Sequence, residues 1–185
     1  MEALTDNELM LRVKNGDLDK MALLFKRHHS ALFGFLYRMT NQREASEDML
    51  QNVFYRMLKS RHTFIGGSFK TWMYHLARNV CKDYMKKKKR EGYHHDLSDF
   101  EERIRGGYPS DERIEQKQEL EILQNALSKL SAENREVLVL SRFQGMKYHE
   151  IAQIMSITEG AVKVRIHRAI DHLKNMYIKI ESNEM

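Results

Sequence analysis

The sequence predicts an all-α protein with two small helical domains joined by a flexible linker. Apolar residues recur at spacings of three and four through most of the chain, which is typical of amphipathic helices. No segment alternates apolar and polar residues for long enough to predict a strand. Glycines and the single proline gather between the two helical regions. The expected boundaries are a first domain over 1–91, a linker over 92–111 and a second domain over 112–185.

The first domain is expected to contain four helices. Thr5 to Glu8 has the spacing of a capping box, and Gly16 can end the short helix that follows. Two longer helices are expected, one over residues 21–39, with Phe25 on its apolar face, and one over about 43–60. Paired glycines make the stretch "RHTFIGG" (61–67) a loop. Ser68 can then cap a fourth helix that runs to about residue 90.

The second domain begins after the glycine-rich linker. Ile114, Leu120, Leu123, Leu127 and Leu130 fit one face of its first helix. Ser131 can cap the next helix, which contains Val137, Leu138 and Leu140 and ends at Gly145.

Residues 147–173 predict a helix-turn-helix. Ala152 supplies the small residue where two helices cross, and Thr158 is placed to cap the second helix. Val162, Ile166 and Ile170 repeat at four and fit its buried side. Lysine and arginine on the other side can meet phosphates, and a carboxylate near the helix start can accept from a cytosine amino group. Ser156 occupies the turn position that often holds glycine in a left-handed conformation, at a cost of up to about 1 kcal/mol.

Charge divides the chain into unlike parts. Residues 1–92 hold 18 Lys/Arg against 10 Asp/Glu, residues 93–126 hold 4 against 9, and residues 127–185 hold 9 against 7. A basic module attracts phosphate backbones. Helix 68–90 also carries Trp72, Leu76, Val80 and Tyr84 at a spacing of four, beside lysines and arginines. Basic residues with interleaved aromatics suit unstacked bases on single-stranded DNA. The alternative is a core tryptophan on a helix with a solvated basic end.

Three segments, in order, resemble the extracytoplasmic-function (group 4) sigma factors of bacterial RNA polymerase, in the sigma-70 family. "EDMLQNVFYRM" (47–57) resembles region 2.2, and "FKTWMYHLARNVCKDYMKKKKR" (69–90) resembles regions 2.3 and 2.4. "LSAENREVLVLSRFQGMKYHEIAQIM" and the helix that follows resemble region 4. Departures from the family pattern are Ser131, Tyr148 and Ser156.

The resemblance implies a promoter-specificity subunit with a sigma-2 domain, a sigma-4 domain and no chemistry of its own. It implies contacts with the β′ clamp helices and β flap of core polymerase, with promoter DNA, and with an anti-sigma factor or another recruiting partner. Carried over by position, the implied polymerase-binding residues are Asp48, Gln51, Asn52 and Phe54, of which Phe54 fits a core role equally well. The implied −10 residues are Phe64, Ser68, Lys70, Trp72, Arg78, Asn79 and Lys82. The implied −35 residues are Thr158, Glu159, Lys163, Arg165 and Arg168.

Two other classes of function fit parts of the sequence. A stand-alone helix-turn-helix repressor or activator explains residues 147–173 but leaves the aromatic, basic helix without a role. A metal-dependent nuclease would need a ligand cluster, and the adjacent pairs His28-His29 and His94-His95 do not face one another on a helix. We therefore expect neither catalysis nor a metal or other cofactor.

Cysteine content and hydropathy predict a cytoplasmic protein without membrane insertion. The one cysteine, Cys81, excludes an internal disulfide and suits a reducing compartment. The chain has neither an N-terminal apolar segment for secretion nor a run of about 18 apolar residues for a membrane span.

Overall fold

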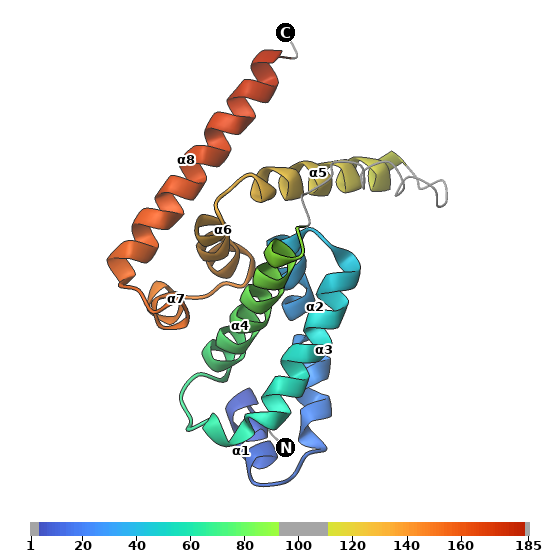
Figure 1. Cartoon of the computed structure of the whole chain (residues 1–185), viewed down its shortest axis with the longest axis vertical. Coiled ribbons are helices and arrows are strands. Elements are labelled where there is room, and N and C mark those ends of the chain that lie inside the picture. The colour runs from blue at the N-terminus through green and yellow to red at the C-terminus, as the bar shows by residue number, and fades with distance from the viewer. Residues whose placement is uncertain (1–3, 93–110, 184–185) are drawn as a thin grey trace.

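The computed structural model describes residues 4–92 and 111–183, and over these residues the chain is helical with short connections (Figure 1). The predicted all-α class is confirmed. The helices are α1 (Asp6–Lys14), α2 (Lys20–Thr40), α3 (Arg43–Lys59), α4 (Phe69–Arg90), α5 (Asp111–Ser128), α6 (Ala132–Leu138), α7 (Tyr148–Met155) and α8 (Glu159–Asn183). A 3-10 turn, η1 (Arg61–Thr63), precedes α4, and a π-helical turn, η4 (Val139–Phe143), extends α6. The predicted linker, except for its two end residues, lies outside the described residues.

Helices α1, α4, α6 and α8 begin directly after the capping residues that the sequence predicts. Thr5 and Glu8 form a reciprocal capping box at the start of α1. The hydroxyls of Ser68, Ser131 and Thr158 each accept a hydrogen bond from the backbone N–H three residues later. These contacts satisfy N–H groups that the helix itself leaves unpaired.

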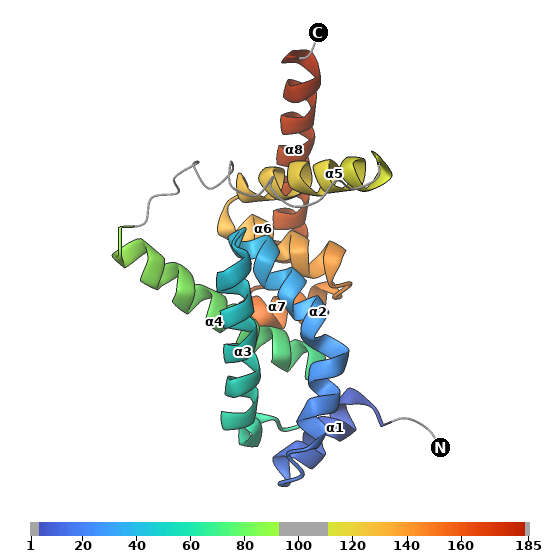
Figure 2. The same cartoon turned by 90° about the vertical axis from the view of Figure 1, so that its right-hand side faces the viewer.

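The first module consists of α1 to α4. Helices α2, α3 and α4 pack along one another, and α1 contacts both α2 and α4 (Figures 1 and 2). One buried face of α4 carries Phe69, Met73, Ala77 and Cys81. The predicted stripe is only partly core, since Val80 is buried while Trp72, Leu76 and Tyr84 are half-buried. Phe25, expected on the inner face of α2, is 43% exposed and stacks on His29 at the rim of the module.

The second module consists of α5 to α8. Leu127 of α5 and Leu130, which follows the end of that helix, pack with Leu138 and Ala169 in a small buried cluster. Leu120, expected on this inner face, is 60% exposed because it lies on the part of α5 beyond that cluster. The C-terminal part of α8 projects away from the body (Figures 1 and 2).

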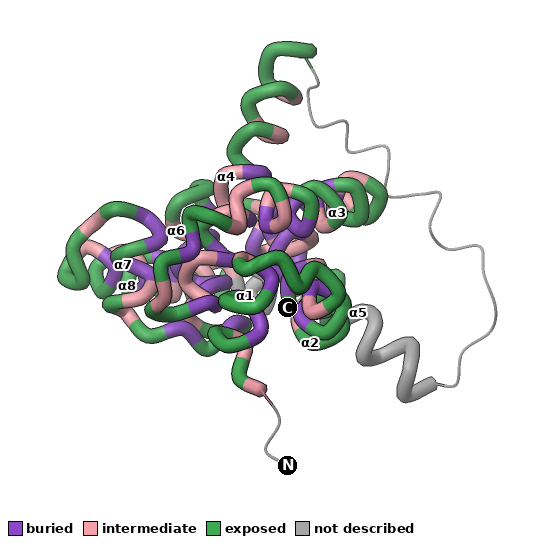
Figure 3. Tube along the Cα trace, turned by 90° about the horizontal axis from the view of Figure 1, so that it is seen from below, coloured by how far each residue is buried: buried purple, intermediate pink, exposed green. Residues whose placement is uncertain are grey.

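The two modules are packed together, a contact that the sequence did not predict. Helix α4 contacts α7, and α2 contacts α5, α6 and η4. A single buried cluster runs from Leu9 and Phe35 in the first module to Leu140 and Ile151 in the second. Buried segments accordingly fill the interior, and exposed ones form the rim (Figure 3).

Candidate nucleic-acid interface

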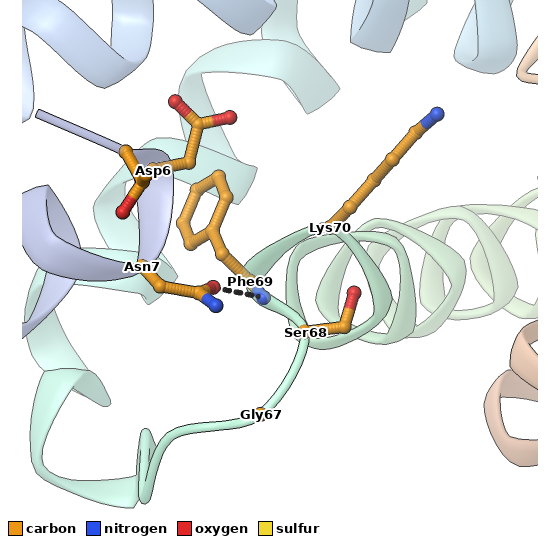
Figure 4. A pocket seen from close by; sticks show the side chains of 7 residues that line it. Asp6, Asn7, Gly67, Ser68, Phe69 and Lys70 are labelled. Atoms are coloured by element: carbon orange, nitrogen blue, oxygen red, sulfur yellow. Dashed lines mark hydrogen bonds between the residues drawn. The ribbon is translucent and has the colours of Figure 1, made fainter. Parts of the chain in front are cut away.

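The loop between α3 and α4 is held at both ends by α1. Lys14 Nζ donates a hydrogen bond of 2.7 Å to the carbonyl oxygen of Phe64. Asn7 Oδ1 accepts one of 2.7 Å from the backbone N–H of Phe69 (Figure 4). Between these anchors Gly66 and Gly67 have φ of +100° and +83°, which a side chain would strain. The loop therefore has a defined path, although its sequence looks flexible.

A pocket of about 470 Å³ lies between this loop and α1 (Figure 4). Its lining residues come from the first turn of α1 and from the start of α4. They are Thr5, Asp6, Asn7, Gly67, Ser68, Phe69 and Lys70. The pocket is a shallow depression that is largely open to solvent. Two backbone N–H groups in the first turn of α4 are already paired at this end, because Phe69 donates to Asn7 and Thr71 donates to Ser68.

Phe64 lies beneath the loop instead of at its surface. Its side chain is 1% exposed, and its ring is 5.5 Å from Trp72 and 6.4 Å from Phe69, measured between ring centroids. Trp72 is half-buried and donates its indole N–H to Thr63 Oγ1 at 3.2 Å. The large apolar residue that the loop presents to solvent is Ile65, which is 91% exposed. The aromatic rings thus form the floor that supports the loop.

Lys70, Tyr74 and Arg78 lie one turn apart along α4 and meet the second module. The Nζ of Lys70 donates to the carbonyl of Gln144, and Tyr74 OH donates to Gln144 Oε1 at 2.6 Å. Arg78 Nε pairs with Glu136 Oε1 at 2.6 Å, and the two side chains are 13% and 7% exposed. Of the implied −10 residues, Lys82 is exposed and Asn79 is half-buried.

Burial is the main cause of the pKa shifts of Glu136 and Cys81, which lie close to this contact. It raises the pKa of Glu136, against the opposing effect of Arg78 and Lys82. It also raises the pKa of the Cys81 thiol to about 12, with a further contribution from the nearby Glu136. Cys81 is therefore an unreactive packing residue in this arrangement.

The residues implied in polymerase binding do not all share one exposed face. Asp48, Gln51 and Asn52 are exposed on α3, and Asn52 accepts a hydrogen bond from Arg56. Phe54 is 7% exposed and packs against Phe25, with ring centroids 4.8 Å apart. In this structure Phe54 is a core residue, while the three polar residues are exposed.

Helices α7 and α8 form the predicted helix-turn-helix. Ser156 has φ +56° and ψ +47°, so it adopts the left-handed conformation that the turn requires without the usual glycine. Ala152, Val162 and Ile166 are buried between the helices. The outer side of α8 carries the residues implied in −35 binding. Thr158, Glu159, Lys163 and Arg168 are exposed, whereas Arg165 is half-buried and pairs with Glu133 at 3.1 Å.

Neither a metal-ligand cluster nor a membrane-length apolar helix occurs within residues 4–92 and 111–183. Among the side chains that the structure describes, no group of three or more His, Cys, Asp or Glu is placed to hold a metal ion. Within the same ranges every helix is too short or too polar to cross a bilayer.

Fold and surface together define an all-helical protein with a helix-turn-helix and a second, basic helical module. Comparison with known proteins identifies the family. Residues 24–91 match the family model of Sigma-70 region 2, and residues 120–173 match that of Sigma-70, region 4. The chain belongs to the sigma-70 family and, within it, to the extracytoplasmic-function sigma factors. By family it is a DNA-binding subunit of transcription initiation and not an enzyme.

Two relatives and one solved structure illustrate this similarity. The ECF RNA polymerase sigma-E factor of Haemophilus influenzae is 30% identical over 183 residues, which cover 94% of this chain and 96% of that protein. The ECF RNA polymerase sigma factor SigX of Bacillus subtilis is 30% identical over 165 residues, with 82% and 80% covered. The structure of CnrH in complex with the cytosolic domain of CnrY shares the fold, with a TM-score of 0.73 at 23% identity, over 94% of this chain and 97% of that one.

Sequence reasoning missed the contribution of α1 to the site. Asn7 and Lys14 are separated from the loop by about fifty residues or more, and nothing local links them to it. It also missed Ile65, although an apolar residue next to paired glycines in a loop is a signal that could have marked it.

Proposed function

We propose that this chain binds core RNA polymerase and directs it to promoters by holding −35 duplex DNA and trapping melted −10 bases. The observation that carries the proposal is the order of two modules in one chain. A loop-and-pocket site on a basic module is followed by a helix-turn-helix module, and both match sigma-70 regions. A stand-alone repressor would need only the helix-turn-helix module.

The −35 role rests on the outer face of α8. Lys163 and Arg168 are exposed and can neutralise phosphates, and Thr158 and Glu159 stand at the helix start, which in a helix-turn-helix enters the major groove. The exposed carboxylate of Glu159 can accept from a cytosine amino group there.

The −10 role rests on the pocket beside Ser68 and on α4. A flipped base must be unstacked at a cost of a few kcal/mol, which only a well-shaped pocket offsets. The anchored loop and the neighbouring basic helix supply shape and charge for a base and its phosphate. Asn79 and Lys82 complete this surface on the next turns of α4.

Polymerase binding is assigned to the polar face of α3. Asp48, Gln51 and Asn52 lie within one turn and are exposed together. An anti-sigma factor is proposed as a further partner, because the sigma factor RpoE of Bartonella quintana, solved with its anti-sigma factor NepR, has the same fold, with a TM-score of 0.68.

Run-off transcription with core polymerase and a promoter library tests the assignment. Addition of the chain should yield transcripts from a defined subset of promoters. Asn79→Ala should reduce open-complex formation while leaving polymerase affinity unchanged. It is a cleaner probe than Phe64→Ala, since removing a buried phenyl ring destabilises the fold by about 3–5 kcal/mol. Specific binding to duplex half-sites without polymerase, and no promoter-dependent transcript, would favour the stand-alone regulator.

A further inference from the structure

The side chain of Asn7 lines the pocket and reaches from α1 toward the start of α4 (Figure 4). Its amide oxygen accepts the backbone N–H of Phe69 at 2.7 Å. Only the oxygen half of an asparagine amide can accept a hydrogen bond, so this contact fixes which way the amide is turned. The NH2 half, with two N–H donors, is therefore the part that remains for another partner.

No protein group takes up these donors in the part of the chain that the structure describes. The bond to Phe69 is the one hydrogen bond that the Asn7 side chain makes there, and the residue is exposed. An amide that is held by its oxygen and open at its nitrogen can donate to a ligand without first being ordered. Asn7 is thus a preorganised hydrogen-bond donor at the pocket.

The other polar side chains that line the pocket are already paired within the protein. Asp6 is bonded through one carboxylate oxygen to Arg27 and through the other to His28, both at 2.7 Å. The remaining three are Thr5, which pairs with Glu8; Ser68, which pairs with the N–H of Thr71 and with Glu150; and Lys70, which pairs with the carbonyl of Gln144. Asn7 therefore supplies the side-chain donor that a ligand in this pocket would meet.

A donor at this position favours a ligand group that accepts. The carbonyl oxygens and unprotonated ring nitrogens of nucleotide bases are acceptors, whereas their amino groups are donors. A base that turned an amino group toward Asn7 would place donor against donor. The pocket can therefore discriminate among bases by the edge that they present, as well as by their size.

We propose that Asn7 determines which base is preferred at one −10 position, by donating an amide N–H to an acceptor atom on the captured base. The proposal rests on the promoter function proposed above and adds to it a specificity-determining residue on α1. Residue 7 precedes the segment that matches Sigma-70 region 2, which begins at residue 24, so the match to the family does not assign this role.

Asn7→Asp separates base recognition from anchoring of the loop. Aspartate keeps an oxygen for the N–H of Phe69 and replaces the NH2 group with a second acceptor of nearly the same size. Wild type and variant, each as the full chain with core polymerase, transcribe a promoter library randomised over the −10 element, and the transcripts are sequenced. At one position the base that the wild type favours should lose about fivefold against a base that presents an amino group. This ratio among bases does not change when DNA affinity falls uniformly.

Two further variants complete the experiment. Asn7→Ala removes both the anchor and the donor, so it should reduce open-complex formation and weaken the preference at the same position. It also serves if Asn7→Asp does not fold. Asn15→Asp makes the same chemical change at the other end of α1, at an exposed residue that does not line the pocket. It should leave every base preference as in the wild type.

Two results would overturn the role of Asn7 alone. One is a wild type with clear −10 preferences that Asn7→Asp leaves unchanged, because Asn7 would then only anchor the loop. The other is an equal change of preference in Asn15→Asp, because the added charge would then be the cause. A wild type that yields no promoter-dependent transcripts contradicts the promoter function itself, and the proposal fails with it.

Discussion

Lys14 and Phe64 are joined by a hydrogen bond of 2.7 Å from the ammonium group of the first to the backbone carbonyl of the second. The bond ties α1 to the start of the loop that borders the pocket. Residue 14 lies outside the segment that matches Sigma-70 region 2, which begins at residue 24. The loop is thus positioned by a helix that the matched segment does not include.

Replacing Lys14 with methionine should therefore loosen the loop without removing any group that faces the pocket. A hydrogen bond to a charged group contributes about 1.5–3 kcal/mol, so open-complex formation should fall about tenfold or more. Permanganate footprinting of melted promoter DNA measures this. Polymerase affinity should not change, and Lys26→Met, at an exposed position of α2, is the control. Normal melting by Lys14→Met would show that the loop needs no anchor.

Replacing Ser156 with glycine should stabilise the folded protein. Its φ of +56° is costly for any residue with a Cβ atom, and glycine removes that cost. Ser156→Gly should raise the free energy of unfolding by up to about 1 kcal/mol, and Ser156→Val should lower it by more. Urea denaturation followed by circular dichroism compares the three proteins. A less stable glycine variant would mean that the serine side chain contributes more than the backbone strain costs.

Glu133 should limit the contact of Arg165 with DNA. The carboxylate lies 3.1 Å from the guanidinium, so a phosphate must displace it. Glu133→Gln should strengthen −35 duplex binding and steepen its salt dependence by up to about 0.9 in logarithmic slope, the value for one added phosphate contact. Arg168→Ala should weaken binding and reduce the slope, because Arg168 is exposed. Fluorescence anisotropy at several salt concentrations provides both slopes, and an identical slope for Glu133→Gln and wild type would show that Glu133 does not keep Arg165 from a phosphate.

The thiol of Cys81 should be protected from modification in the native protein. Burial raises the pKa of its thiol to about 12, so at pH 8 almost none of it is the reactive thiolate. Iodoacetamide should therefore label the wild type far more slowly than the protein unfolded in guanidinium. Mass spectrometry follows the single site. Rapid labelling of the native protein would contradict the buried position.

Much of the fold could be predicted because its signals are local. Thr5, Ser68, Ser131 and Thr158 each cap the helix that follows them, since the hydroxyl and the N–H it accepts are only three residues apart. The turn at Ser156 follows from the short distance between two amphipathic segments. The family could be predicted as well, because each of its three motifs is a short pattern and their order along the chain is specific.

Exposure of the candidate site residues could not be predicted in the same way. Phe64 and Phe54 match positions where the family makes contacts, yet both are buried, because the face a side chain presents depends on which helices pack against it. Arg78, expected to face DNA, pairs with Glu136, 58 residues away. No periodic pattern in the sequence indicates that these two residues are in contact.

The sequence by itself determined the helices, their caps, the helix-turn-helix and the family, because these depend on residues within a few positions of one another. Only the tertiary structure decided that the two modules pack together, that α1 anchors the loop, and that Glu136 forms an ion pair with Arg78. Each of these joins segments far apart in the chain, where the partner is chosen by shape and charge in three dimensions.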